Sequence, residues 1–146
     1  LMHIFHHVLY EGIGLRQLLD YYYILKSLDK EQRLQVFEEM RHLGLAKFVE
    51  AVMYVEQQMF GLEPEFFLCK PNERLGKLLL AEIELAGNFG KYDKRNQHLN
   101  RKSRMDVYLH NVKRNFVFFK FAPSEVLWAP IWKPCHFVWR KLKGYS

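Results

Sequence analysis

The chain has few cysteines, no long apolar run and no strand pattern, and each of these shortages excludes a class of protein. Cys69 and Cys135 are the two cysteines and form no CxxC pair. Neither a disulfide framework nor a zinc site of paired cysteines is therefore expected, and reduced thiols are typical of a cytoplasmic protein. No apolar run approaches the roughly 18 residues of a membrane-spanning helix, so no transmembrane segment is predicted. The GxxxxGK(S/T) and HExxH motifs are also absent, which argues against a P-loop and a zincin-type metal site.

Helices are predicted throughout, because no segment shows a convincing alternation of apolar and polar residues bounded by hairpin turns. Apolar residues recur instead at spacings of three and four. Capping residues set the predicted boundaries: Asp29 opens one helix and Gly44 ends it. Gly61 ends the next helix, and Asn72 opens a helix that Gly87 stops. The sequence predicts an all-α fold, an irregular bundle of about six to seven helices.

The C-terminal part is expected to contain one long and several short helical pieces. A basic helix carries apolar residues on one face from Met105 to Phe119 and should end at Pro123. Pro130 and Pro134 should confine the rest to short pieces, the last of them a short aromatic and basic C-terminal helix. Its mixture of aromatic and cationic residues suits a membrane interface or stacking on bases. Packing onto the core or onto another domain is the third interpretation.

Charge is divided unevenly along the chain, whose formal net charge is +6. Residues 1–90 hold 9 Lys/Arg and 13 Asp/Glu, whereas residues 91–146 hold 13 Lys/Arg and 3 Asp/Glu. A basic half of this size attracts phosphate, nucleic acid or an acidic surface. The alternative is a solvated basic face that covers an acidic neighbour.

Two histidines near the start are candidates for a site. His3 and His7 are four residues apart, so on a helix they share a face, as two metal ligands would. A third, acidic ligand could come from Glu11 or Asp20. Surface or packing histidines are the simpler interpretation.

Arg16 and Asp20 are also four residues apart, directly after a Gly12-Ile-Gly14 break. The structural interpretation is an ordinary ion pair on a helix surface. The functional interpretation places Arg16 on a phosphate, because a guanidinium binds phosphate through two parallel hydrogen bonds. Helix N-terminal amides beside the glycine break would favour the same anion.

Arg104 and His110 suggest a third kind of chemistry, because an arginine followed by a histidine at this spacing is similar to the ribonuclease motif of HEPN-type domains. Six residues place the two side chains about 240° apart around a straight helix, so they would converge only if the helix bent.

Several short motifs together resemble a known family. In chain order they match the C-terminal half of the uncharacterised nucleotidyltransferase family found in bacterial gene clusters. They are the run from Gly12 to Asp20 (GIGLRQLLD) after the histidine-rich helix, Leu43–Phe48 (LGLAKF), Gly87–Gly90 (GNFG), and Pro123–Glu125 (PSE) with the tryptophan-rich tail.

This resemblance implies a catalytic core upstream, in which an Asp-x-Asp pair on a strand holds Mg²⁺ against a nucleoside triphosphate. Residues 1–146 contain no Asp-x-Asp. They would form a single helical domain that packs on that core and is inactive alone. The resemblance also implies which residues face the cleft between the domains: His3, His7, Arg16 and Asp20. Arg16 would contact phosphate, while His7 and Asp20 would orient or hydrogen-bond the substrate.

The first helix adds an expectation about partners. Leu1 begins in the middle of an apolar stripe without an N-cap residue, so this helix should expose an apolar face. The upstream catalytic domain of the same polypeptide, or a second copy in a homo-oligomer, would cover it. The alternative to a nucleotidyltransferase domain is a stand-alone helical module whose basic face binds nucleic acid or an acidic partner; a HEPN-like ribonuclease is the third.

Overall fold

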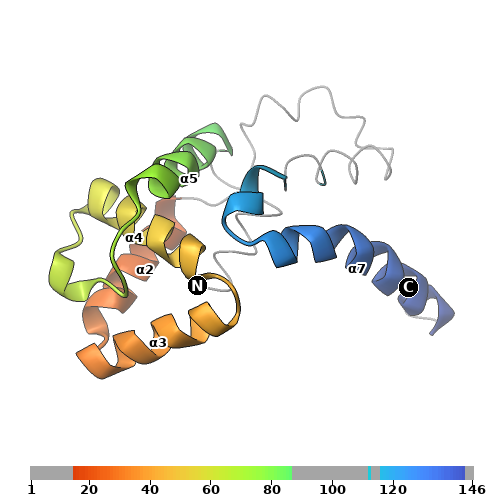
Figure 1. Ribbon diagram of the computed structural model, residues 1–146, viewed down its shortest axis with the longest axis horizontal. Coiled ribbons are helices and arrows are strands. Elements are labelled where there is room, and N and C mark those ends of the chain that lie inside the picture. The colour runs from red at the N-terminus through yellow and green to blue at the C-terminus, as the bar shows by residue number, and fades with distance from the viewer. Residues whose placement is uncertain (1–14, 87–111, 113–115, 144–146) are drawn as a thin grey trace.

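The computed structural model describes residues 15–86, 112 and 116–143, and these residues form helices joined by short connections (Figure 1). The order of the elements along the chain is α2 (Leu15–Ser27), α3 (Lys30–His42), α4 (Ala46–Phe60), the 3₁₀ turn η1 (Pro64–Phe66), α5 (Glu73–Ala86), the 3₁₀ turn η4 (Phe116–Lys120) and α7 (Pro123–Leu142). The described part of the chain contains no strand, so the predicted all-α class is confirmed there. It holds five α-helices, and the total of six to seven stays a prediction.

The helix boundaries follow the capping residues. Asp29 accepts a hydrogen bond from the Gln32 amide at 2.8 Å, and the Gln32 side chain accepts one from the Asp29 amide at 3.0 Å. This reciprocal pair satisfies two amides that have no partner inside α3. Gly44 and Gly61 follow α3 and α4 with φ of 73° and 68°, the left-handed conformation that ends helices. The predicted boundaries at these positions are confirmed.

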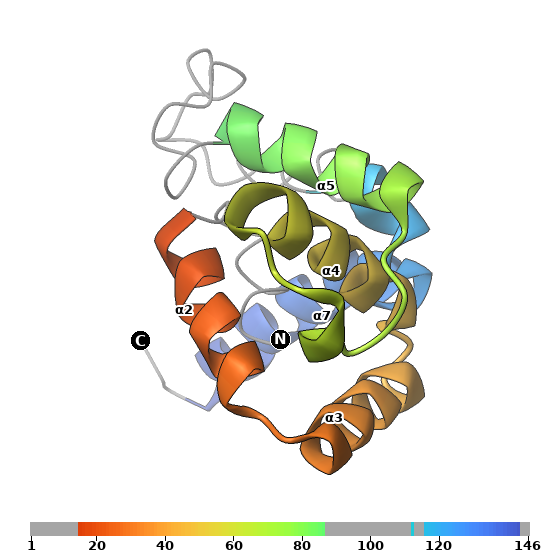
Figure 2. The same ribbon diagram turned by 90° about the vertical axis from the view of Figure 1, so that its left-hand side faces the viewer.

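Helix α4 is the centre of the core. Seven of its residues are buried: Phe48, Val49, Ala51, Val52, Met53, Val55 and Glu56. In both views α4 lies between α5 on one side and α3 on the other, with α2 packed alongside (Figures 1 and 2). Gly76 of α5 is buried against the Tyr54 ring of α4, and a Cβ atom at this position would overlap that ring. The two helices therefore approach each other closely at a position where a larger residue would force Tyr54 or one of the helices to shift.

Helix α7 is anchored to this core at its beginning. Phe118, Phe121, Ala122 and Val126 are buried, and the Phe121 ring meets Phe48 of α4 edge-on with the centroids 6.5 Å apart. Beyond this anchor α7 runs away from the group formed by α2 to α5 (Figure 1). No helix among the residues that the structure describes is long and apolar enough to cross a membrane.

The end of the chain differs from the prediction in two ways. The expected short pieces are one helix of 20 residues, so the C-terminal helix is not short. Pro123 occupies its first turn, where a proline costs no hydrogen bond. Pro130 and Pro134 lie inside the helix, where each removes one backbone hydrogen bond, a loss that bends a helix more readily than it ends one. In addition, Phe116–Lys120 forms a 3₁₀ turn and not the end of an α-helix.

Candidate functional site

Arg16 and Asp20 lie on the outer face of α2. Both side chains are exposed and stand one turn apart. Among the described residues no hydrogen bond or ion pair joins them, so the ordinary ion pair of the structural interpretation is not formed. Both groups are thus exposed and not paired with each other.

Exposed apolar side chains surround these two charges. Leu15, Leu19 and Tyr23 recur every four residues on α2, and Tyr23 is 64% exposed. Ile24 continues the row that contains Arg16 and Asp20. We call these six residues the α2 outer face. The opposite side of the helix, with Leu18, Tyr21 and Leu25, is buried in the core.

The C-terminal end of α2 is fixed in place by Lys26. Its ammonium group donates hydrogen bonds to Glu63 at 3.1 Å and to the Tyr22 hydroxyl at 3.3 Å, and it lies 5.0 Å from the centre of the Phe66 ring. The hydrogen bonds to Glu63 and then to Tyr22 raise the pKa of Lys26 above its usual value. These contacts join the end of α2 to the connection after α4.

The other residues predicted for a site, His3, His7, Arg104 and His110, lie outside the described residues. The same is true of Gly12 and Gly14. Arg16 and Asp20 are therefore the two predicted site residues whose surroundings can be described.

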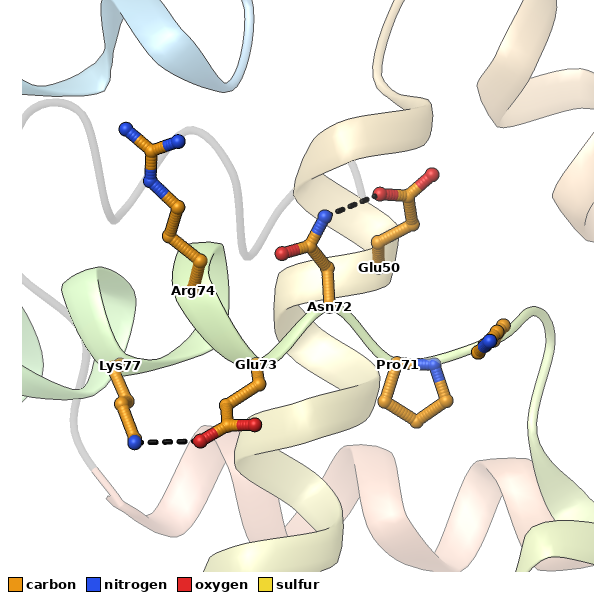
Figure 3. Close-up of a pocket in the computed structure, with 7 residues that line it drawn as sticks. Glu50, Pro71, Asn72, Glu73, Arg74 and Lys77 are labelled. Atoms are coloured by element: carbon orange, nitrogen blue, oxygen red, sulfur yellow. Dashed lines mark hydrogen bonds and ion pairs between the residues drawn. The ribbon is translucent and has the colours of Figure 1, made fainter.

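A cleft of about 700 Å³ lies where α5 begins beside the middle of α4 (Figure 3). Asn72 organises it: its side chain accepts a hydrogen bond from the Leu75 amide at 3.1 Å and donates one to Glu50 at 3.2 Å. The predicted N-cap of this helix is thus confirmed, and the same side chain ties the start of α5 to α4. The lining residues are Glu50, Lys70, Pro71, Asn72, Glu73, Arg74 and Lys77.

The side chains that line this cleft carry a net positive charge. Glu73 and Lys77 pair at 2.6 Å, so their charges compensate each other. Arg74 and Lys70 are exposed and have no ion-pair partner in the part of the chain that the structure describes. The Arg74 guanidinium points away from Glu50 and Asn72 (Figure 3). Sequence reasoning identified Asn72 alone, because the cleft combines residues more than 20 positions apart.

Two further groups are buried without a hydrogen-bond partner among the described residues: both carboxyl oxygens of Glu56 and the Tyr21 hydroxyl. Burial raises the pKa of Glu56 from 4.5 to about 8, because a carboxylate loses its hydration in the core. Burial, and then the nearby Glu56, raise the pKa of Tyr21. Burial also raises the pKa of the Cys69 thiol to about 12, so Cys69 is not a ready nucleophile.

The described residues do not fit a Mg²⁺ site. They contain no group of three or more His, Cys, Asp or Glu side chains that could hold a metal ion. Glu82 and Glu84 are two residues apart on α5, which places them on different sides of the helix. Glu63 of the Glu63-Pro-Glu65 segment is already paired with Lys26. A metal-bound triphosphate would need carboxylates from elsewhere.

Comparison with protein-family models, with curated proteins and with solved structures found no match.

Proposed function

We propose that this chain is the helical, substrate-facing domain of a nucleotidyltransferase-like protein, and that the α2 outer face meets a domain that carries the metal and the nucleotide. The resemblance of the Gly12–Asp20 run supplies the class of reaction. The observation that carries the proposal is the position of Arg16, an exposed guanidinium without an ion-pair partner among the described residues, which lies among exposed apolar side chains of one helix face.

The α2 outer face is suited to contact with another protein domain. Exposed Leu15, Leu19 and Tyr23 favour contact with another protein surface, since contiguous apolar patches mark interaction sites. When that contact excludes water, a guanidinium beside it binds phosphate more strongly than it does in bulk solvent. In this arrangement Arg16 contacts the phosphates, and Asp20 accepts a hydrogen bond from the acceptor substrate or orients Arg16.

Binding of a Mg²⁺-loaded, non-hydrolysable nucleoside triphosphate to the full-length polypeptide tests this proposal. We expect Arg16→Ala to weaken binding by about 2 kcal/mol, or about 30-fold, the value of a charge-assisted hydrogen bond. Arg74→Ala serves as the matched control, because it removes an exposed arginine from the α4–α5 cleft. Equal affinities of the wild type and Arg16→Ala would contradict the proposal.

A second function is favoured by the cleft between α4 and α5. The cations Lys70 and Arg74 stand beside the first turn of α5, whose amides carry the positive end of the helix dipole. This arrangement supports an interaction module that binds nucleic acid or an acidic partner. Salt-sensitive binding of an RNA or DNA oligonucleotide, lost in Lys70→Ala/Arg74→Ala and kept in Lys47→Ala on α4, is the expected result. Binding that none of these variants changes would rule out the cleft.

A further inference from the structure

Helix α7 exposes an unusual number of large apolar side chains. Among the α7 side chains that the structure describes, six lie open to solvent: Leu127, Trp128, Ile131, Trp132, Trp139 and Leu142. Trp132 is 53% exposed and Leu142 is 82% exposed. Single exposed apolar residues are common on any protein, whereas a contiguous group marks a surface that binds something.

These six side chains occupy one face of the helix. The aliphatic residues Leu127 and Ile131 are four positions apart and Leu142 follows eleven later, so they form one row. Trp128, Trp132 and Trp139 form the neighbouring row. At 3.6 residues per turn the two rows span about 140° of the circumference and about 22 Å of the helix length. We call this surface the α7 face.

Aromatic rings are stacked along the edge of the α7 face. The His136 ring is stacked on Trp132 with the centroids 5.4 Å apart and on Trp139 at 5.8 Å. The Lys143 ammonium lies 5.0 Å from the centre of the Trp139 ring. This row places indole groups and a cation side by side, next to the aliphatic row.

The charge of this segment is almost entirely positive. Between residues 123 and 143 the sequence contains four Lys/Arg (Lys133, Arg140, Lys141 and Lys143) and a single acidic residue, Glu125 in the first turn. Helix α7 thus combines an apolar face of aliphatic and tryptophan side chains with lysine and arginine side chains. Such a helix complements an anionic phospholipid surface. Because α7 is not apolar enough to span a bilayer, it would lie along the surface.

Other occupants fit this surface less well. Nucleic acid would stack on the aromatic rings, but Trp132 and Trp139 are already stacked on His136, and the aliphatic row offers nothing to a base. A second copy would bring two cationic helices together, which like-charge repulsion opposes. Tryptophan prefers the boundary between acyl chains and headgroups, because its ring is apolar and its N–H is polar.

We propose that the α7 face binds the surface of an anionic phospholipid bilayer. The aliphatic and tryptophan rows enter the boundary between headgroups and acyl chains, while Arg140 and Lys143 contact lipid phosphates. This interaction needs neither nucleotide nor a second domain, so it goes beyond the nucleotidyltransferase proposal and can fail or succeed independently of it.

The tryptophans provide a direct test, because all three tryptophans of the chain lie in α7. Intrinsic emission of the whole chain is measured with vesicles of equal parts phosphatidylcholine and phosphatidylglycerol, and with vesicles of phosphatidylcholine alone. We expect the anionic vesicles to shift the emission to shorter wavelength and to protect it from acrylamide. The neutral vesicles should bind at least about tenfold more weakly, since the lipid charge is missing.

Paired variants separate the two contributions. Leu127→Gln/Ile131→Gln keeps every tryptophan and every charge, and should abolish the shift, because the aliphatic row is lost. Arg140→Gln/Lys143→Gln should weaken binding to anionic vesicles by about tenfold and leave binding to neutral vesicles unchanged. All four side chains are exposed, so the fold should survive, as circular dichroism would verify. Leu34→Gln is the matched control, since Leu34 is an exposed leucine on α3.

Three results would overturn the proposal. The first is emission that anionic vesicles leave unchanged. The second is a shift that Leu127→Gln/Ile131→Gln retains in full, which would place the contact elsewhere. The third is the same emission shift without lipid, produced by dimerisation or by an RNA oligonucleotide, since the α7 face would then have a different occupant.

Discussion

At the scale of single residues, Glu56 makes the stability of the fold depend on pH. Its carboxyl group is fully buried in α4, and neither oxygen has a hydrogen-bond partner among the described residues. Burial raises its pKa to about 8, so the folded protein holds it as a neutral acid at neutral pH. Tyr21, which is buried nearby with an unpartnered hydroxyl, feels the same charge when Glu56 ionises.

The pH dependence of folding follows from this shift. The unfolded chain releases the Glu56 proton near the ordinary value of 4.5, whereas the folded chain keeps it until about pH 8. Between these values the folded state binds more protons, so stability falls as pH rises, by about 1 kcal/mol per pH unit. We expect Glu56→Gln to remove this slope, so its free energy of unfolding should rise relative to that of the wild type with increasing pH.

Urea unfolding of both proteins at several pH values between 5 and 8 measures the effect. Glu65→Gln, a change at an exposed carboxylate in η1, is the control and should follow the wild-type profile. Parallel profiles for the wild type and Glu56→Gln would show that Glu56 is not a neutral acid in the folded protein.

The sequence alone could not single out Glu56. It lies in α4 among apolar residues, at a spacing equally compatible with a half-exposed position. Its burial results from packing of the other helices around α4. The capping residues Asp29 and Asn72 were predictable because an N-cap acts on amides within three residues of itself.

At the scale of the elements, the contact between α4 and α5 depends on a missing side chain. Gly76 is buried against Tyr54. A Cβ atom at position 76 would overlap both the ring and the Cβ atom of Tyr54. Glycine inside a helix lowers its stability by about 1 kcal/mol relative to alanine. Gly76 has this effect on α5, but it allows α5 to approach α4 more closely.

Alanine at position 76 should therefore destabilise the protein in spite of its higher helix propensity. We expect Gly76→Ala to lower the free energy of unfolding by about 2 kcal/mol, because Tyr54 or the whole helix must shift. Tyr54→Ala removes the ring but keeps the Cβ, so it should reduce the added cost of Gly76→Ala in the double variant without abolishing it. A double-mutant cycle by urea unfolding measures this coupling, and additive effects would refute the proposed overlap.

The helix boundaries were easier to predict from the sequence than which side of each helix is buried. Gly44 and Gly61 end their helices as expected, because the left-handed conformation favours glycine locally. Leu34, by contrast, fits an apolar stripe of α3 but is 56% exposed. The length of α7 was predicted wrongly, since the two internal prolines were expected to end the helix and do not.

At the scale of the whole molecule, two exposed faces are available for binding. The α2 outer face belongs to the acidic half of the sequence and presents Arg16 among apolar residues, whereas the α7 face belongs to the basic half. Apolar periodicity predicted the helix that carries the α2 outer face, whereas the segment that forms α7 was expected to be several short pieces. Periodicity did not predict which side is exposed: Leu15 and Leu19 fit the apolar stripe of α2 as well as Leu18 does, but only Leu18 is buried. Their exposure depends on how helices distant in sequence pack.

The central claim is that the α2 outer face meets the nucleotide-carrying domain, and hydrogen–deuterium exchange on the full-length polypeptide tests it most directly. Exchange is compared with and without a Mg²⁺-loaded, non-hydrolysable nucleoside triphosphate. We expect the nucleotide to slow exchange in α2, Leu15–Ser27, and this protection to be lost in Arg16→Ala. Protection that leaves α2 unchanged and appears only around the α4–α5 cleft, from Lys70 to Lys77, would contradict the claim and favour the anion-binding module.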